Sequence, residues 1–191
     1  MAKNFILILG GIRSGKSRFA QSMAAKLGKK VLFVATAEAL DAEMTFRIRE
    51  HKKVRPKDWR TLEININVGQ KLGRQIADAD VVLLDCLTLL VSNVIIGDSK
   101  SPASVAQKRV VSEIEDLVKC IDKCEGTFII VSNEVGLGLM PANKLGRLYC
   151  DCLGRANQLL ARHASHVYFM VSGIPIAIKG EVHQECERGW E

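Results

Sequence analysis

The feature that most constrains the fold is a glycine-rich segment that directly follows a short apolar run. Residues Gly10 to Ser17 read Gly-Gly-Ile-Arg-Ser-Gly-Lys-Ser and fit the pattern G-x-x-x-x-G-K-[ST]. The preceding run Phe5–Leu9 predicts a buried strand, and Lys16–Leu27 predicts a helix that ends near Gly28. A strand, a glycine-rich turn and a helix in this order are typical of a loop that binds phosphate.

This phosphate loop suits a nucleoside triphosphate. Glycines let the backbone approach the phosphates closely, and the N-terminus of the following helix adds positive potential. We expect Lys16 to reach the β- and γ-phosphates and Ser17 to ligate Mg²⁺. The residues of the predicted phosphate loop are Gly10, Gly11, Ile12, Arg13, Ser14, Gly15, Lys16 and Ser17.

An acidic residue at the end of another apolar run provides a second metal ligand. The run Val81–Leu84 consists of four apolar residues and is followed by Asp85. Taken alone, such an acid often caps a helix or lies at the surface. Beside a phosphate loop, the favoured interpretation is a carboxylate that holds the Mg²⁺ of a bound nucleotide.

Short apolar runs alternate with helix-period segments along the chain. Pro175 places the last apolar segment, Ile174–Ile178, at an edge of the sheet. The predicted fold is therefore α/β, a P-loop NTPase of the RecA-like kind, with a mostly parallel sheet between helices and an edge strand near the C-terminus. We expect one catalytic domain over residues 1–180 and a polar tail over 181–191. Further predicted strands are Val31–Ala35, Phe128–Val131 and Val167–Val171, and further predicted helices are Ala103–Cys124 and Asn143–Ala164.

Composition argues against several classes of protein. No run of about 18 apolar residues occurs, so we expect no membrane-spanning helix. The net charge of +6 favours an anionic ligand, whereas 5% aromatic residues offer little stacking surface for nucleic acid. The six cysteines do not have zinc-site spacings, and no secretory segment is apparent. We therefore expect reduced thiols and a cytoplasmic location.

A basic cluster follows a predicted amphipathic helix. Leu40, Met44 and Ile48 recur every four residues, and His51 continues this stripe at its end. The cluster over residues 52–56 comes next. Taken alone, a histidine at a helix end is most often structural or solvated, and a basic cluster is usually a solvated face. These residues by themselves leave their role open.

Seven segments in a fixed order carry a resemblance to one family. They are Gly10–Ser17, Ala35–Ala37, Asp41–His51, Arg55–Glu63, Asn133–Pro141, Gly154–Gln158 and Val171–Pro175. Apart from the phosphate loop, each segment is a weak signal alone, but the ordered set is specific. The chain resembles the adenosylcobinamide kinase/adenosylcobinamide-phosphate guanylyltransferase family from the first strand to about Lys179.

The resemblance implies a bifunctional enzyme of cobalamin biosynthesis. It would phosphorylate adenosylcobinamide with ATP or GTP and then transfer GMP from GTP to the new phosphate through a GMP–histidine intermediate. His51 is the position that matches the nucleophile, and Lys16 is the other catalytic residue. The resemblance also implies a homotrimer. Beyond the phosphate loop, the implied nucleotide-binding residues are Ala35, Thr36, Ala37, Lys52, Arg55, Glu63 and Asp85.

Two other functions are compatible with the phosphate loop. One is a P-loop small-molecule kinase without transferase activity, in which His51 is structural. The other is a RecA-like nucleic-acid-dependent ATPase or a nucleotide-gated binding module, which only the net charge of +6 supports. For the transferase, a carboxylate at Glu63 could accept hydrogen bonds from N1 and N2 of guanine, which adenine does not offer.

Overall fold

Strands and helices alternate along the described part of the chain. The computed structural model describes residues 4–38, 45–46, 49, 52–53, 55–76, 78–97 and 101–181. The strands are β1 (Phe5–Gly10), β2 (Val31–Ala35), β3 (Arg60–Glu63), β4 (Val81–Asp85), β5 (Thr127–Val131), β6 (His166–Val171) and β7 (Ile174–Lys179). The helices are α1 (Lys16–Leu27), α3 (Val68–Leu72), α4 (Leu87–Ile96), α5 (Ala103–Lys123) and α6 (Lys144–His163).

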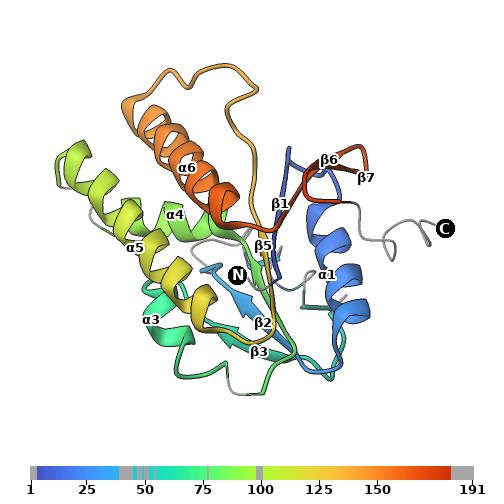
Figure 1. The fold of residues 1–191 in the computed structure, drawn as a ribbon. Coiled ribbons are helices and arrows are strands. Elements are labelled where there is room, and N and C mark those ends of the chain that lie inside the picture. Colours follow the sequence, from blue (N-terminus) through green and yellow to red (C-terminus); the bar gives the residue numbers. More distant parts are fainter. Residues whose placement is uncertain are drawn as a thin grey trace.

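The strands form one twisted sheet in the order β3-β2-β4-β5-β1-β6-β7 (Figure 1). Strands β1 to β6 pair in parallel, and β7 pairs with β6 in the antiparallel direction. Parallel strands require crossover connections, which the helices supply. The predicted α/β class, the mostly parallel sheet and the edge strand near the C-terminus are confirmed.

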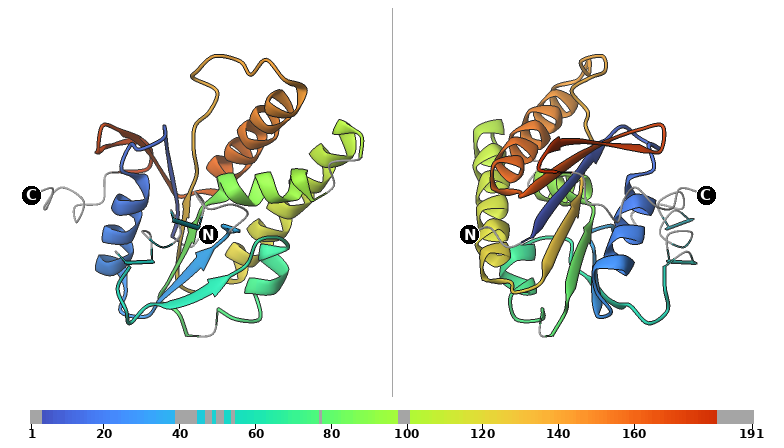
Figure 2. Two further views of the ribbon diagram at one scale, coloured as in Figure 1. Left: turned by 180° about the vertical axis from the view of Figure 1, so that it is seen from behind. Right: turned by 45° about the vertical axis from the view of Figure 1, so that its right-hand side comes forward.

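Helices cover both faces of this sheet (Figures 1 and 2). Ile6 and Ile8 of β1 pack in the cluster that includes Phe19 of α1. The alternate residues Phe5 and Leu7 pack on the opposite face, in a cluster built with α3, α4, α5 and α6. Because successive side chains of a strand point to opposite faces, a central strand buried on both faces must be apolar throughout.

The register aligns the carboxyl ends of four strands. Ala35 at the end of β2 is paired with Glu63 on β3 and with Asp85 on β4. Asp85 is in turn paired with Val131 at the end of β5. The ends of these strands therefore lie along one edge of the sheet, the edge at which ligands bind in open parallel sheets.

Three elements differ from the sequence expectations. Helix α4 was not expected, because its residues continue the apolar run that begins with β4. Strand β3 is polar and largely exposed, so it shows little of the apolar pattern used to find strands. The five-residue α3 is too short to show a helical period.

Some expectations fall outside the described residues. They are most of the predicted helix that ends at His51 and all of the tail beyond residue 181. The extent of the single domain, residues 1–180, stays a prediction. Among the described helices, none is both long enough and apolar enough to cross a membrane.

A buried carboxylate joins α5 to the start of α3. Glu113, which is 8% exposed, accepts hydrogen bonds from the backbone N–H groups of Asn67 at 2.9 Å and Val68 at 2.7 Å. The first N–H groups of a helix lack partners within that helix, and a carboxylate satisfies them with favourable charge. Glu113 therefore holds the connection between β3 and α3 against the core.

We predict that Glu113→Ala lowers the free energy of unfolding by about 1–3 kcal/mol, because it leaves two backbone donors without partners. Glu115→Ala, two residues further along α5 and exposed, is the matched control and should change stability by less than about 0.5 kcal/mol. Urea unfolding followed by circular dichroism measures both. Equal midpoints for the two variants would contradict the role of Glu113.

Candidate functional site

The glycine-rich segment forms a tight loop between β1 and α1. Gly10, Arg13 and Gly15 have positive φ angles of 150°, 56° and 92°. A Cβ on Gly10 would lie 2.6 Å from the carbonyl oxygen of Met170, closer than side chains approach. Glycine is therefore required at Gly10 both by backbone conformation and by space.

A turn from the far end of the chain supports this loop. Ser172 and Gly173, with φ angles of 52° and 85°, connect β6 to β7 in the conformation of a tight two-residue hairpin. The N–H of Gly173 donates to the carbonyl oxygen of Ser14 at 3.1 Å. A Cβ on Gly15 would lie 3.3 Å from Cα of Gly173. The hairpin turn and the phosphate loop thus pack backbone to backbone.

Lys16 is the buried cation of the loop. It is 7% exposed, and its Nζ donates to the carbonyl oxygen of Gly11 at 2.6 Å. Burial lowers the pKa of Lys16 below its ordinary value, and the negative charge of the nearby Asp85 acts in the opposite direction. Lys16 and Asp85, which the sequence places about 70 residues apart, therefore act on each other across the site.

The ends of β2 and β4 are joined through one hydroxyl group. The Oγ1 of Thr36, which is fully buried, donates to the carbonyl oxygen of Cys86 at 2.7 Å and accepts from its N–H at 3.0 Å. Asn93 of α4 donates from Nδ2 to the carbonyl oxygens of Thr36 and Asn65. These bonds fix the residues that follow β2, β3 and β4, and hence the backbone that carries Asp85.

A second charged group lies at the end of β3. Lys52 donates from Nζ to Oε1 of Glu63 at 2.6 Å, with side chains that are 50% and 63% exposed. The guanidinium carbon of Arg55 stacks 3.4 Å from the ring centre of Phe33, and Nη1 donates to Oγ1 of Thr61 at 2.9 Å. Of the predicted nucleotide-binding residues, Lys52, Arg55 and Glu63 are thus brought together.

Arg55 has unused hydrogen-bonding capacity. Its Nε is buried and has no partner among the described residues. Burial lowers the pKa of Arg55, while the carboxylates of Asp85 and Glu63 act in the opposite direction. A buried guanidinium donor that lacks an acceptor suits an anionic ligand.

The two charged regions share one edge of the sheet but are well separated. Four strand spacings of about 4.8 Å lie between β3 and β1, so Glu63 and the phosphate loop are about 19 Å apart along the sheet. Asp85 on β4 lies between them. His51, the predicted nucleophile, lies outside the described residues.

Polar residues beyond the sequence predictions support the edge between these regions. Asn157 of α6 is 6% exposed, accepts from Oγ of Ser132 at 2.7 Å and donates to the carbonyl oxygen of Asn133 at 3.0 Å. The N–H of Asn133 donates to Oγ1 of Thr88. The sequence signal for Asn157 was its place in the motif Gly154–Gln158, which did not indicate a role.

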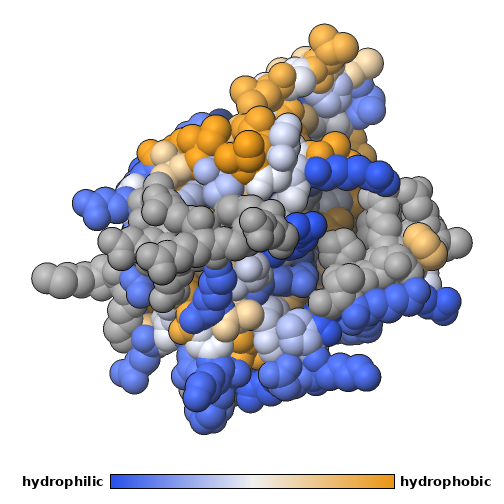
Figure 3. Space-filling view, turned by 90° about the vertical axis from the view of Figure 1, so that its right-hand side faces the viewer, coloured by the Kyte–Doolittle hydropathy of each residue, from blue (hydrophilic) through white to orange (hydrophobic). Residues whose placement is uncertain are grey.

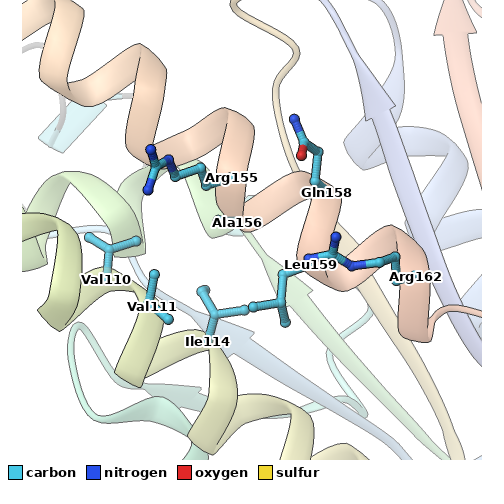
Figure 4. A pocket seen from close by; sticks show the side chains of 8 residues that line it. All are labelled: Val110, Val111, Ile114, Arg155, Ala156, Gln158, Leu159 and Arg162. Atoms are coloured by element: carbon cyan, nitrogen blue, oxygen red, sulfur yellow. The ribbon is translucent and has the colours of Figure 1, made fainter.

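The other polar residues of this motif point elsewhere. Arg155 and Gln158 line a cavity of about 320 Å³ between α5 and α6 (Figure 4). The floor of this cavity is apolar and includes Ile114 and Leu159. Within this motif, Asn157 therefore supports the sheet edge, whereas Arg155 and Gln158 lie on the side of α6 that faces the cavity.

Fold and site together define the class of protein. The glycine-rich loop follows a central parallel strand, opens a helix and surrounds a buried lysine, and an aspartate at the end of another parallel strand lies within electrostatic reach of that lysine. This combination defines a P-loop nucleotide-binding protein.

Comparison with known proteins identifies the particular family. A family described as cobinamide kinase / cobinamide phosphate guanyltransferase matches residues 6–178. The chain belongs to this family, as the resemblance of its motifs predicted.

Two relatives match over nearly their whole length. The bifunctional adenosylcobalamin biosynthesis protein CobP of Pseudomonas aeruginosa is 42% identical, over 92% of this chain and 97% of the relative. The bifunctional adenosylcobalamin biosynthesis protein CobU of Escherichia coli is 38% identical, over 91% and 99%. Among solved structures, a RadB recombinase aligns with a TM-score of 0.47 and 14% identity, over 87% of this chain and 73% of that chain.

Cys86 provides a test of the electrostatics beside Asp85. Burial, followed by the neighbouring charge of Asp85, raises the pKa of the Cys86 thiol to about 11. A raised pKa keeps the thiol protonated at pH 8, where the thiolate fraction is about one-hundredth of that of a cysteine with the ordinary pKa of 9.0. We predict that alkylation of folded Cys86 by iodoacetamide keeps rising tenfold per pH unit up to about pH 10.

Mass spectrometry of the Cys86 peptide measures this rate. The chain unfolded in urea is the control, and its rate should begin to level near pH 9. Poor access to the sulfur lowers the rate at every pH but does not change the slope. A folded-state rate that levels near pH 9 would contradict the raised pKa.

Proposed function

We propose that this protein is a bifunctional enzyme that phosphorylates adenosylcobinamide and then transfers GMP to the product. The observation that carries the proposal is the P-loop with its buried Lys16 on the same sheet edge as the cluster of Lys52, Arg55 and Glu63. Membership in the cobinamide kinase / cobinamide phosphate guanyltransferase family supports both reactions. The names of the relatives state that they are bifunctional.

In the first reaction, a hydroxyl oxygen of adenosylcobinamide attacks the γ-phosphorus of ATP or GTP, and the nucleoside diphosphate leaves. Lys16 stabilises the negative charge that develops on the phosphoryl oxygens, and the N–H groups of the loop hold the phosphates. To do so, Lys16 exchanges its bond to the Gly11 carbonyl for one to the phosphates.

Ser17 and Asp85 fit the Mg²⁺ that accompanies such a nucleotide. A hydroxyl and a carboxylate are the hard oxygen donors that Mg²⁺ accepts, usually with phosphates and waters completing its coordination. In the part of the chain that the structure describes, no group of three or more His, Cys, Asp or Glu side chains could hold a metal ion. Ser17 and Asp85 would therefore hold Mg²⁺ together with the nucleotide, where it neutralises phosphate charge.

In the second reaction, a ring nitrogen of His51 attacks the α-phosphorus of GTP, and pyrophosphate leaves. An oxygen of adenosylcobinamide phosphate then attacks the same phosphorus, which frees His51 and gives adenosylcobinamide-GDP. Covalent catalysis of this kind replaces one difficult displacement by two easier ones. Lys52 and Arg55 supply positive charge for the phosphates, and the exposed Glu63 is accessible as an acceptor for guanine N1 and N2.

The remaining nucleotide contacts are also part of the proposal. Ala35 and Ala37 would contribute through their position at and just after the end of β2, where the carbonyl oxygen of Ala35 accepts from the N–H of Ile64 at 2.9 Å. The hydroxyl of Thr36 is engaged with Cys86, so its part would be to shape this backbone. Assembly into a homotrimer is a further part of the proposal, supported by the family resemblance. A cytoplasmic location is another part, supported by cysteine spacings that fit neither a disulfide framework nor a zinc site.

We predict that Lys16→Ala removes most kinase activity while the protein stays folded. Loss of this cation should cost several kcal/mol of transition-state stabilisation, or on the order of 10³-fold in kcat/KM. Lys29→Ala, exposed and just beyond the C-terminal end of α1, is the matched control. A kinase rate within about threefold of the unmodified protein would show that Lys16 does not act on the phosphates.

We predict that His51→Asn abolishes covalent labelling by GTP that carries ³²P at the α position and retains phosphorylation of adenosylcobinamide. The direct γ-phosphoryl transfer needs Lys16 but no histidine nucleophile. His163→Asn, at the exposed end of α6, is the control and should label normally. Acid-labile label retained in His51→Asn would place the nucleophile at another residue. If the unmodified protein takes no label, the protein is a kinase without transferase activity.

A further inference from the structure

The segment between β5 and α6 carries three large apolar side chains into solvent. Leu137, Leu139 and Met140 are 80%, 99% and 69% exposed, and we call them the apolar tip. Figure 1 shows this segment arching beyond the sheet before it enters α6, and apolar side chains cover the top of the molecule in Figure 3. A group of exposed apolar side chains of this size marks an interaction site.

Both ends of the segment are anchored. Glu134 donates from its N–H to the carbonyl oxygen of Gly10 at 3.0 Å, and its Oε1 accepts from the N–H of Gly136 at 2.6 Å. At the other end, Nη1 of Arg147 donates to the carbonyl oxygens of Pro141 and Ala142. The exposure of the apolar tip is therefore built into the fold.

The anchoring bond to Gly10 starts this segment at the phosphate loop itself. The loop also presents an apolar side chain to solvent: Ile12 is 77% exposed. Strand β5, which leads into the segment, lies between β1 and β4, the strands that end in the phosphate loop and in Asp85. The segment therefore leaves the sheet where the γ-phosphate of a bound nucleotide would meet its acceptor.

We propose that the apolar tip, together with Ile12, binds the corrin macrocycle of the phosphoryl acceptor. This inference rests on the proposed function, which requires the hydroxyl of a large corrinoid to reach the γ-phosphate. A nucleotide is a poor match for the surface, since its phosphates and base need charged and hydrogen-bonding partners. A macrocycle with apolar ring faces and alkyl edges matches it, because its burial removes apolar area from water on both sides.

The test is a set of serine substitutions measured in two assays. The variants are Leu139→Ser and the triple Leu137→Ser/Leu139→Ser/Met140→Ser. Isothermal titration with adenosylcobinamide, without nucleotide, gives Kd, and steady-state phosphorylation with ATP gives KM for each substrate. We expect the triple variant to raise both Kd and KM for adenosylcobinamide by about tenfold or more, with KM for ATP and kcat within about twofold.

Two control variants separate apolar contact from general effects. Ile178→Ser removes an equally large side chain, 59% exposed, from β7. Its neighbour Lys179 pairs with Val167 at the start of β6, so Ile178 lies at the edge of the sheet opposite the phosphate loop. This variant should bind adenosylcobinamide normally. Leu139→Met keeps an apolar side chain and should bind nearly as well as the unmodified protein.

Other outcomes overturn the inference. An unchanged Kd and KM for adenosylcobinamide in the folded triple variant would do so while leaving the kinase proposal intact. An unchanged Kd with a smaller assembly in light scattering would assign the apolar tip to a contact between copies of the chain. If the unmodified protein binds adenosylcobinamide but does not phosphorylate it, the proposed function fails, and the titration alone still decides whether the apolar tip holds the macrocycle.

Discussion

The phosphate loop depends on close contact between two backbones with no side chain between them. Gly10 packs against the carbonyl group of Met170, and Gly15 packs against Gly173 of the hairpin turn. A side chain at Gly10 would push β6 away from the loop, and the bond from Gly173 to Ser14 would then lengthen. The direction of the loop N–H groups and the position of Lys16 both follow from this contact, so the anion site is a product of packing as much as of sequence motif.

In the proposed sequence of reactions, one sheet edge serves two displacements at phosphorus. The first takes place beside Lys16, and Glu63, the proposed guanine acceptor of the second, lies about 19 Å away across four strand spacings. The phosphate added in the first reaction is the nucleophile of the second, so the same end of the corrinoid must be presented in both reactions. Asp85 lies between them and acts electrostatically on Lys16 and on Arg55.

Much of this arrangement could be predicted from the sequence because its signals are local. The phosphate loop combines a strand, required glycines and a helix start within about 20 residues, and the buried strands are short and apolar. Strand β3 could not be predicted because its side chains are mostly polar. Its position is fixed by pairing with β2 and by the contact between Glu63 and Lys52. Tertiary pairing of this kind overrides local propensity.

Other parts of the site could not have been read from local pattern at all. Thr36 is bonded to Cys86, and Asn157 is bonded to Ser132. These partners are distant in sequence, and a threonine or an asparagine carries no local pattern that identifies its partner. Asn93 reads as one polar residue within an apolar run, yet it holds two strand ends together. The family resemblance pointed to Thr36 as a nucleotide contact, whereas its fully buried hydroxyl is engaged by backbone.

The position of β1 also affects how the chain is made. Strand β1 is flanked by β5 and β6, so the partners of both its hydrogen-bonding edges are synthesised much later than β1 itself. During synthesis the N-terminal segment leaves the ribosome first, while strands that pair across such a distance must await the later residues. The nascent chain therefore carries its nucleotide motif without a working anion site until β5, β6 and the turn after β6 have been synthesised. The β6–β7 turn completes that site, so nucleotide binding depends on residues that are synthesised long after the phosphate loop itself.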